Sequence, residues 1–171
     1  MIPLLRVLLP SLVLILVTLL AVLPWGMGAH AQSVLALAPL TTLFAMNVRR
    51  AHAVPDWMAF LCGLLLDALT NQPLGFWALI HLVVYGLAAL AHQQSTRRLL
   101  SRWLAYVCVL AVTTALMWLV ESLLILSAKP WQPLLQAATV AVIAYPLVDA
   151  LMSAVVALPM RRDSHLHASR G

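Results

Sequence analysis

Charged residues are scarce in this sequence, and their scarcity excludes a soluble domain. Only 9% of the residues are charged, whereas about 25% is typical of soluble globular proteins. Cysteine is also rare. Cys62 and Cys108 lie inside apolar runs and match no metal-binding or redox spacing. We therefore interpret both as small buried hydrophobic residues.

Catalytic signatures are missing as well. The sequence contains no HExxH, no GxSxG, no phosphate-binding loop and no Ser–His–Asp arrangement with loops to hold it. The segments between the apolar runs are too short to build a site, and the few histidines and carboxylates are scattered. We expect no enzymatic activity, no cofactor, and no catalytic or metal-binding residue.

The net charge of +5 does not indicate a nucleic-acid partner. The basic residues fall in small clusters between apolar runs, which is the usual topogenic and lipid-headgroup pattern of membrane proteins. We expect the chain to contact the lipid bilayer and no nucleic acid.

Long apolar runs dominate what is present. Hydrophobic residues make up 64% of the chain and the mean hydropathy is +1.00, so we predict an all-α, polytopic membrane protein. A single domain at residues 1–160 is expected to precede a flexible basic cytoplasmic tail at 161–171. Pro39, near the middle of the second run, predicts a broken or tilted helix there. The six transmembrane helices are predicted at about 7–23, 33–48, 57–69, 74–92, 103–127 and 134–158.

Positive charge is distributed asymmetrically over these six runs. With a cytoplasmic N-terminus, nine basic residues fall on the cytoplasmic side and only Lys129 falls outside. Five of the six tryptophans fall near predicted helix ends, as an aromatic belt requires: Trp25, Trp77 and Trp131 at outer ends, and Trp57 and Trp103 at inner ends. The positive-inside rule therefore predicts that both termini are cytoplasmic.

The first run allows a second interpretation, a secretory signal peptide. Ala29-His30-Ala31 resembles a small-x-small cleavage site, but signal peptides have apolar cores of about 7–15 residues and this run is longer. We favour a retained first helix. Cleavage would leave the rest of the topology unchanged, because Gln32 would then begin outside.

Four ionisable residues are candidates for function, since a charge inside a membrane is costly unless it is paired or hydrated. Asp67, His81 and Glu121 are predicted to share one depth in the outer leaflet. They form either a polar cluster that faces a cavity or a partner, or separate groups that pair locally or reach the interface. Asp149 has Tyr145 four residues earlier, a spacing that allows a hydrogen bond along one helix face or a simple packing contact.

The stretch from Phe60 to Gly75 resembles a known family. The pattern Phe60-x-x-Gly63-x-x-x-Asp67, a polar turn and then Pro73-Leu74-Gly75 is similar to MreD, the rod shape-determining protein of the bacterial inner membrane. The length, the six runs and the short basic tail are similar too. Gly63, Asp67, Pro73 and Gly75 match the family pattern, and no catalytic residue carries over. The short, proline-broken second run departs from it.

This resemblance implies a multi-pass component of the cell-elongation machinery in the inner membrane. Members of the MreD family associate with MreC, and through it with RodA, its penicillin-binding transpeptidase and the actin-like MreB. Their fold is similar to the S components of energy-coupling-factor transporters. The resemblance therefore implies a membrane scaffold that maintains rod shape by organising peptidoglycan synthesis.

The alternative function is a small-molecule-binding transporter subunit on the same fold. S components dock their energising partner through a small-residue pattern of the Ala-x-x-x-Ala type on the first helix. The first run here, VLLPSLVLILVTLLAVL, consists almost entirely of large aliphatic residues. This composition favours the scaffold over transport.

Overall fold

The computed structural model describes residues 2–23, 34–50, 52–70, 72–94, 99–125 and 130–168. Within these ranges every regular element is a helix, which confirms the predicted all-α class. The helices are α1 (Ile2–Val22), α3 (Ala38–Arg49), α4 (Asp56–Thr70), α5 (Phe76–Gln94), α6 (Leu99–Ile125) and α7 (Gln132–Ala168).

Three of these helices are long and apolar enough, by length and composition, to cross a membrane. The candidate spans are Phe76–Gln93, Leu99–Leu123 and Gln132–Val156. Shorter apolar helices lie at Val7–Val22 and Val34–Arg49, below the roughly 20 residues that a full crossing requires. These spans, with the apolar composition, indicate a membrane protein.

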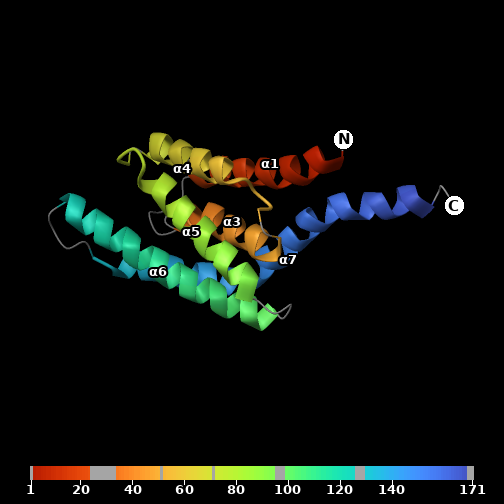
Figure 1. Ribbon diagram of the computed structural model, residues 1–171. Coiled ribbons are helices and arrows are strands. Elements are labelled where there is room, and N and C mark those ends of the chain that lie inside the picture. The colour runs from red at the N-terminus through yellow and green to blue at the C-terminus, as the bar shows by residue number, and fades with distance from the viewer. Residues whose placement is uncertain are drawn as a thin grey trace.

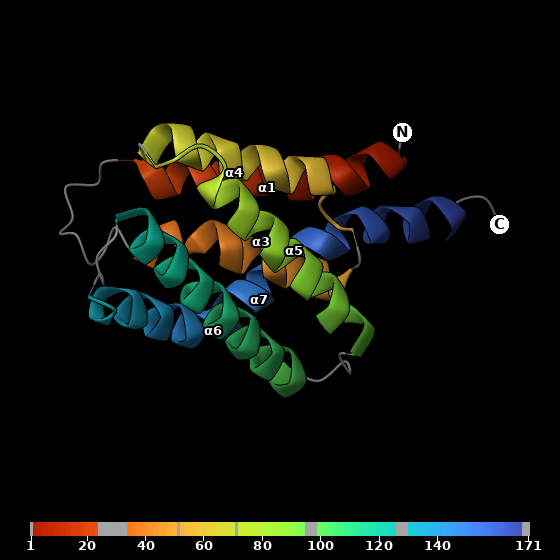
Figure 2. The same ribbon diagram turned by 60° about the vertical axis from the view of Figure 1, so that its left-hand side comes forward.

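Helix α3 forms the centre of the molecule. Its residues from Pro39 to Val48 are all buried. The other five helices form a closed ring in which each contacts the next, in the order α1, α4, α5, α6, α7 and back to α1. Helix α3 contacts α1, α5 and α7 inside this ring, and its central position is visible in both ribbon views (Figures 1 and 2).

The predicted break in the second run is confirmed. Residues 34–36 are helical, the chain turns at Leu37, and α3 begins at Ala38. Pro39 occupies the first turn of α3, where a missing backbone N–H leaves no hydrogen bond unmade. The proline therefore starts the central helix.

Three aromatic rings join the central helix to its neighbours. Tyr106 of α6 stacks on Tyr145 of α7 with ring centroids 4.3 Å apart. Phe44 of α3 lies 5.4 Å from the Tyr106 ring and 6.0 Å from the Tyr145 ring. The Tyr106 hydroxyl shares a 2.8 Å hydrogen bond with Thr41 of α3, so a polar group of the buried helix is paired within the core.

Helix α7 extends further than the sequence predicts. Its end was expected at residue 158, but it continues to Ala168, so residues 161–168 of the expected tail have helical backbone. The C-terminal part of α7 projects beyond the other helices (Figure 2).

Candidate functional site

Asp67 caps the helix that follows it. The residue lies in the last turn of α4 and is only 1% exposed. Its carboxylate oxygens accept hydrogen bonds from the backbone N–H groups of Gly75, at 2.8 Å, and Trp77, at 2.7 Å. These donors belong to the start of α5, where unpaired N–H groups and the helix dipole favour a negative charge. The buried carboxylate is thus satisfied by main-chain donors.

The turn between α4 and α5 depends on Pro73 and Gly75. The Pro73 carbonyl accepts a hydrogen bond from Phe76 N–H at 3.1 Å. Gly75 has a φ of 97°, a left-handed conformation that glycine adopts without steric cost. The turn brings α5 back along α4 and presents its first N–H groups to Asp67.

Gly63 allows the two helices of this hairpin to approach closely. A Cβ atom added there would lie 2.4 Å from Ala78 Cα and 2.6 Å from Ala78 N. Both are backbone atoms of α5, which cannot rotate away as a side chain would. The structure therefore brings Gly63, Asp67, Pro73 and Gly75, the residues that carry the family resemblance, into one hairpin.

His81 makes no hydrogen bond to the Asp67 carboxylate. It is fully buried on α5, and its Nδ1–H donates to the Trp77 carbonyl at 2.8 Å. Its Nε2 is buried and has no hydrogen-bond partner in the described part of the chain. Asp67 and His81 are instead linked through the main chain of Trp77, whose N–H and carbonyl they respectively bind. Both side chains therefore pair with nearby main-chain atoms. This arrangement corresponds to the second sequence hypothesis, that of separate groups that pair locally.

Glu121 is not part of that arrangement. It lies half-buried in the last two turns of α6. The hydrogen bonds that Asp67 and His81 make go to main-chain atoms of the α4–α5 hairpin and do not reach Glu121. Asp67 and His81 therefore lie on one hairpin, and Glu121 lies on a different helix, α6.

Asp149 forms an ionic cluster that the sequence did not predict. Its carboxylate accepts two hydrogen bonds from Arg49, from Nε at 2.8 Å and from Nη2 at 2.6 Å, and one from Arg102 Nη2 at 3.2 Å. Of the two alternatives for Tyr145, the hydrogen bond to Asp149 is not made, because the buried Tyr145 hydroxyl has no partner among the described residues. Tyr145 stacks on Tyr106 instead.

A clue to this cluster existed in the sequence. A carboxylate inside an apolar run requires a cation or other strong donors. The predicted topology assigned Arg49 and Arg102 to the cytoplasmic side and Asp149 to the cytoplasmic half of the sixth run. We interpreted the arginines only as topogenic charges. Their role as partners depends on the burial of α3, which brings Arg49 beside α7.

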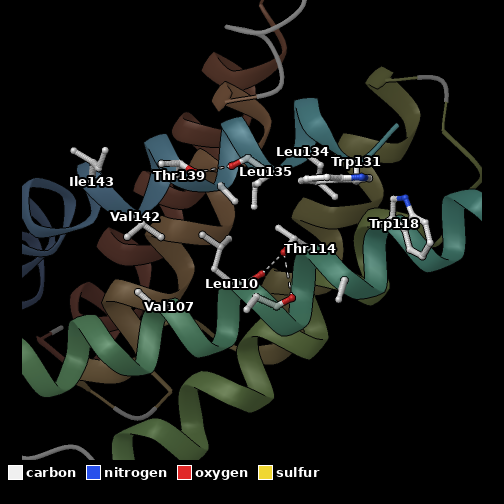
Figure 3. Close-up of a pocket in the computed structure, with 13 residues that line it drawn as sticks. Val107, Leu110, Thr114, Trp118, Trp131, Leu134, Leu135, Thr139, Val142 and Ile143 are labelled. Atoms are coloured by element: carbon white, nitrogen blue, oxygen red, sulfur yellow. Dashed lines mark hydrogen bonds between the residues drawn. The ribbon is translucent and has the colours of Figure 1, made fainter. Parts of the chain in front are cut away.

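An apolar groove of about 460 Å³ lies between α6 and α7 (Figure 3). Trp118 and Trp131 stand at one end, and Val107 and Ile143 line it towards the other. Its two hydroxyl groups are paired within their own helices: Thr114 donates to the Leu110 carbonyl and Thr139 to the Leu135 carbonyl, both at 2.8 Å. The groove thus presents hydrocarbon to whatever fills it.

Across the described ranges, no group of three or more His, Cys, Asp or Glu side chains is placed to hold a metal ion. Comparison of the chain with models of protein families, with curated proteins and with solved structures finds no match.

Proposed function

We propose that this chain is a non-enzymatic scaffold of the bacterial cell-elongation complex. In this proposal it crosses the inner membrane six times with both termini in the cytoplasm. The positive-inside distribution of charge supports the topology, and the resemblance of the Phe60–Gly75 stretch to MreD supports the complex. Its role would be to maintain rod shape by organising peptidoglycan synthesis with MreC.

One observation supports the scaffold proposal: both buried carboxylates, Asp67 and Asp149, bind groups of the protein itself. Asp67 is occupied by the N–H groups that start α5, and Asp149 by Arg49 and Arg102. Binding sites for polar substrates place several polar groups around one cavity, whereas the groove between α6 and α7 has apolar walls. This distribution suits a protein that binds other membrane helices.

The same groove is the surface that we propose for the partner. Ala111, Ala115 and Ala138 lie in its walls, and small residues permit close approach of a second transmembrane helix. The proposed occupant is the membrane-spanning helix of MreC, through which RodA, the penicillin-binding transpeptidase and MreB would be reached indirectly.

The alternative is a small-molecule-binding transporter subunit. The groove volume of about 460 Å³ falls in the range of roughly 300–1,000 Å³ usual for ligand pockets, which favours this alternative. The pairing of both threonine hydroxyls within their helices disfavours it, because few polar groups remain to select a ligand.

Depletion of the protein in its host tests the proposed function. We expect rod-shaped cells to become spheres, because wall synthesis would lose its organisation along the cylinder, and we expect MreC to co-purify with the tagged protein. Light microscopy after depletion and affinity purification are the measurements. Normal rods after complete depletion would contradict the scaffold, and loss of uptake of a vitamin with normal shape would support the transporter.

A bulky side chain in the groove tests the partner surface. Ala111 is exposed in the wall of the groove, and Ala111→Phe should reduce co-purification of MreC at least tenfold by occupying the space of the partner helix, about 1.4 kcal/mol of binding free energy. Ala68→Phe provides a matched control, because Ala68 is exposed on α4, outside the groove. Equal recovery of MreC with both variants, at equal membrane levels, would exclude the groove.

A further inference from the structure

The two arginines at Asp149 share a single carboxylate. Arg49, the last residue of α3, makes the bidentate contact, with hydrogen bonds of 2.8 and 2.6 Å. Arg102, in the first turn of α6, makes only one contact, at 3.2 Å. Asp149 is 1% exposed, so its charge is directed inward at the arginines. Arg49 therefore forms a bidentate ion pair with Asp149, whereas Arg102 contacts the same carboxylate through one longer hydrogen bond.

The charge of this cluster is not balanced. Two guanidinium groups and one carboxylate leave one positive charge. Arg102 Nε is buried and has no hydrogen-bond partner in the ranges that the structure describes, and the salt bridges of both arginines there go to Asp149 alone. A partly desolvated charge without a counter-ion is costly. The cluster therefore attracts an additional anion.

The cluster is open to the surface near one end of a candidate membrane span. The side chains of Arg49 and Arg102 are 20% and 16% exposed. Arg102 lies about 4–5 Å along the axis from the first residue of α6 at 1.5 Å per residue, where a candidate membrane span begins. The N–H groups of that first turn add partial positive charge. The planar guanidinium fork matches the oxygens of a phosphate group.

We propose that Arg102, supported by Arg49 and the first turn of α6, binds the phosphate of an anionic lipid headgroup at this end of the bundle. Basic pockets between transmembrane helices bind anionic headgroups in this way. The position at a membrane boundary favours lipid over free phosphate, although both present the same oxygens. The site lies on α3, α6 and α7 and is independent of the partner proposed above.

Native mass spectrometry of the full-length protein in detergent tests this proposal. Phosphatidylglycerol and phosphatidylethanolamine with the same acyl chains would be titrated separately. We expect the anionic lipid to bind about fivefold or more tightly, the effect of one basic residue at a membrane surface, and we expect high salt to reduce this preference. Equal affinities for the two lipids in the wild-type protein would overturn the proposal without need of any variant.

Two substitutions identify the residue that binds. Arg102→Gln should remove most of the preference for phosphatidylglycerol, whereas Arg102→Lys, which keeps the charge but not the guanidinium fork, should retain part of it. Lys129→Gln removes one positive charge elsewhere in the chain and controls for net charge. A preference unchanged by Arg102→Gln in folded protein would overturn the proposal. A competition experiment with millimolar inorganic phosphate distinguishes the two sources of phosphate oxygens. If phosphate fails to displace phosphatidylglycerol, the ligand is a lipid headgroup. Complete displacement would overturn the assignment to lipid.

Discussion

Replacement of Gly63 by alanine is expected to lower the free energy of unfolding by about 3 kcal/mol, at the upper end of the usual cost of overpacking. The added methyl group would lie 2.4–2.8 Å from backbone atoms of Trp77 and Ala78. Since backbone atoms of a helix cannot move independently, α4 and α5 must separate, and the Asp67 cap must lengthen with them. The measurement is the thermal unfolding midpoint of the purified protein in detergent, followed by tryptophan fluorescence.

Gly86 supplies the matched control for this substitution. Like Gly63 in α4, Gly86 lies inside a helix, α5. A Cβ atom added at Gly86, however, meets no atom within 4 Å. Alanine favours a helix over glycine by about 1 kcal/mol, so Gly86→Ala should leave the midpoint unchanged or raise it. A similar decrease for both variants would show that close helix approach at Gly63 does not determine stability.

The hairpin is the part of the structure that the sequence predicted best. The polar turn after Thr70 separated two apolar runs, and Asp67 was placed at the end of the first of them. Local pairing was among the roles considered for that carboxylate, and its contacts to Gly75 and Trp77 lie within the hairpin. These features are local in sequence, and local chemistry of turns and helix ends is enough to predict them.

The central position of α3 could not be predicted in the same way. The sequence predicted a short, proline-broken transmembrane helix at 33–48, whereas α3 has the sequence APLTTLFAMNVR, with 12 residues and several polar side chains. The structure pairs these polar groups inside the protein: Thr41 with Tyr106, and Asn47 Oδ1 with the N–H of Val54. The Thr41–Tyr106 pair joins residues 65 positions apart in the chain, and hydrophobic periodicity does not encode such a contact.

The ionic cluster at Asp149 also could not be predicted from hydrophobic periodicity. Arg49 and Asp149 are separated by 100 positions in the chain. Helical spacing suggested Tyr145 as the nearest partner for Asp149, but a neutral hydroxyl provides less stabilisation to a buried carboxylate than a bidentate guanidinium. The choice between them was determined by tertiary packing, which placed the end of α3 beside α7.

Replacement of Asp67 by alanine is expected to lower the free energy of unfolding by about 3 kcal/mol, because two hydrogen bonds to a charged acceptor are lost and the Trp77 N–H is left buried without a partner. Asp67→Asn should have a smaller effect. Its amide oxygen can still accept one hydrogen bond, but its NH₂ group would face the second donor. Thermal unfolding of the purified variants is the measurement of stability.

Asp56 provides the matched control for Asp67→Asn, because its carboxylate is exposed and accepts a hydrogen bond from the adjacent N–H of Trp57, at 2.9 Å. Asp56→Asn should cost at most about 1 kcal/mol, the usual range for a charge at a helix N-terminus. In cells, Asp67→Asn should insert at normal levels and impair rod shape, since the hairpin positions α5, which packs on the central helix. Equal stability and equal cell shape for the two variants would show that the cap at Asp67 is dispensable, and the hairpin would then depend on Gly63 and the turn alone.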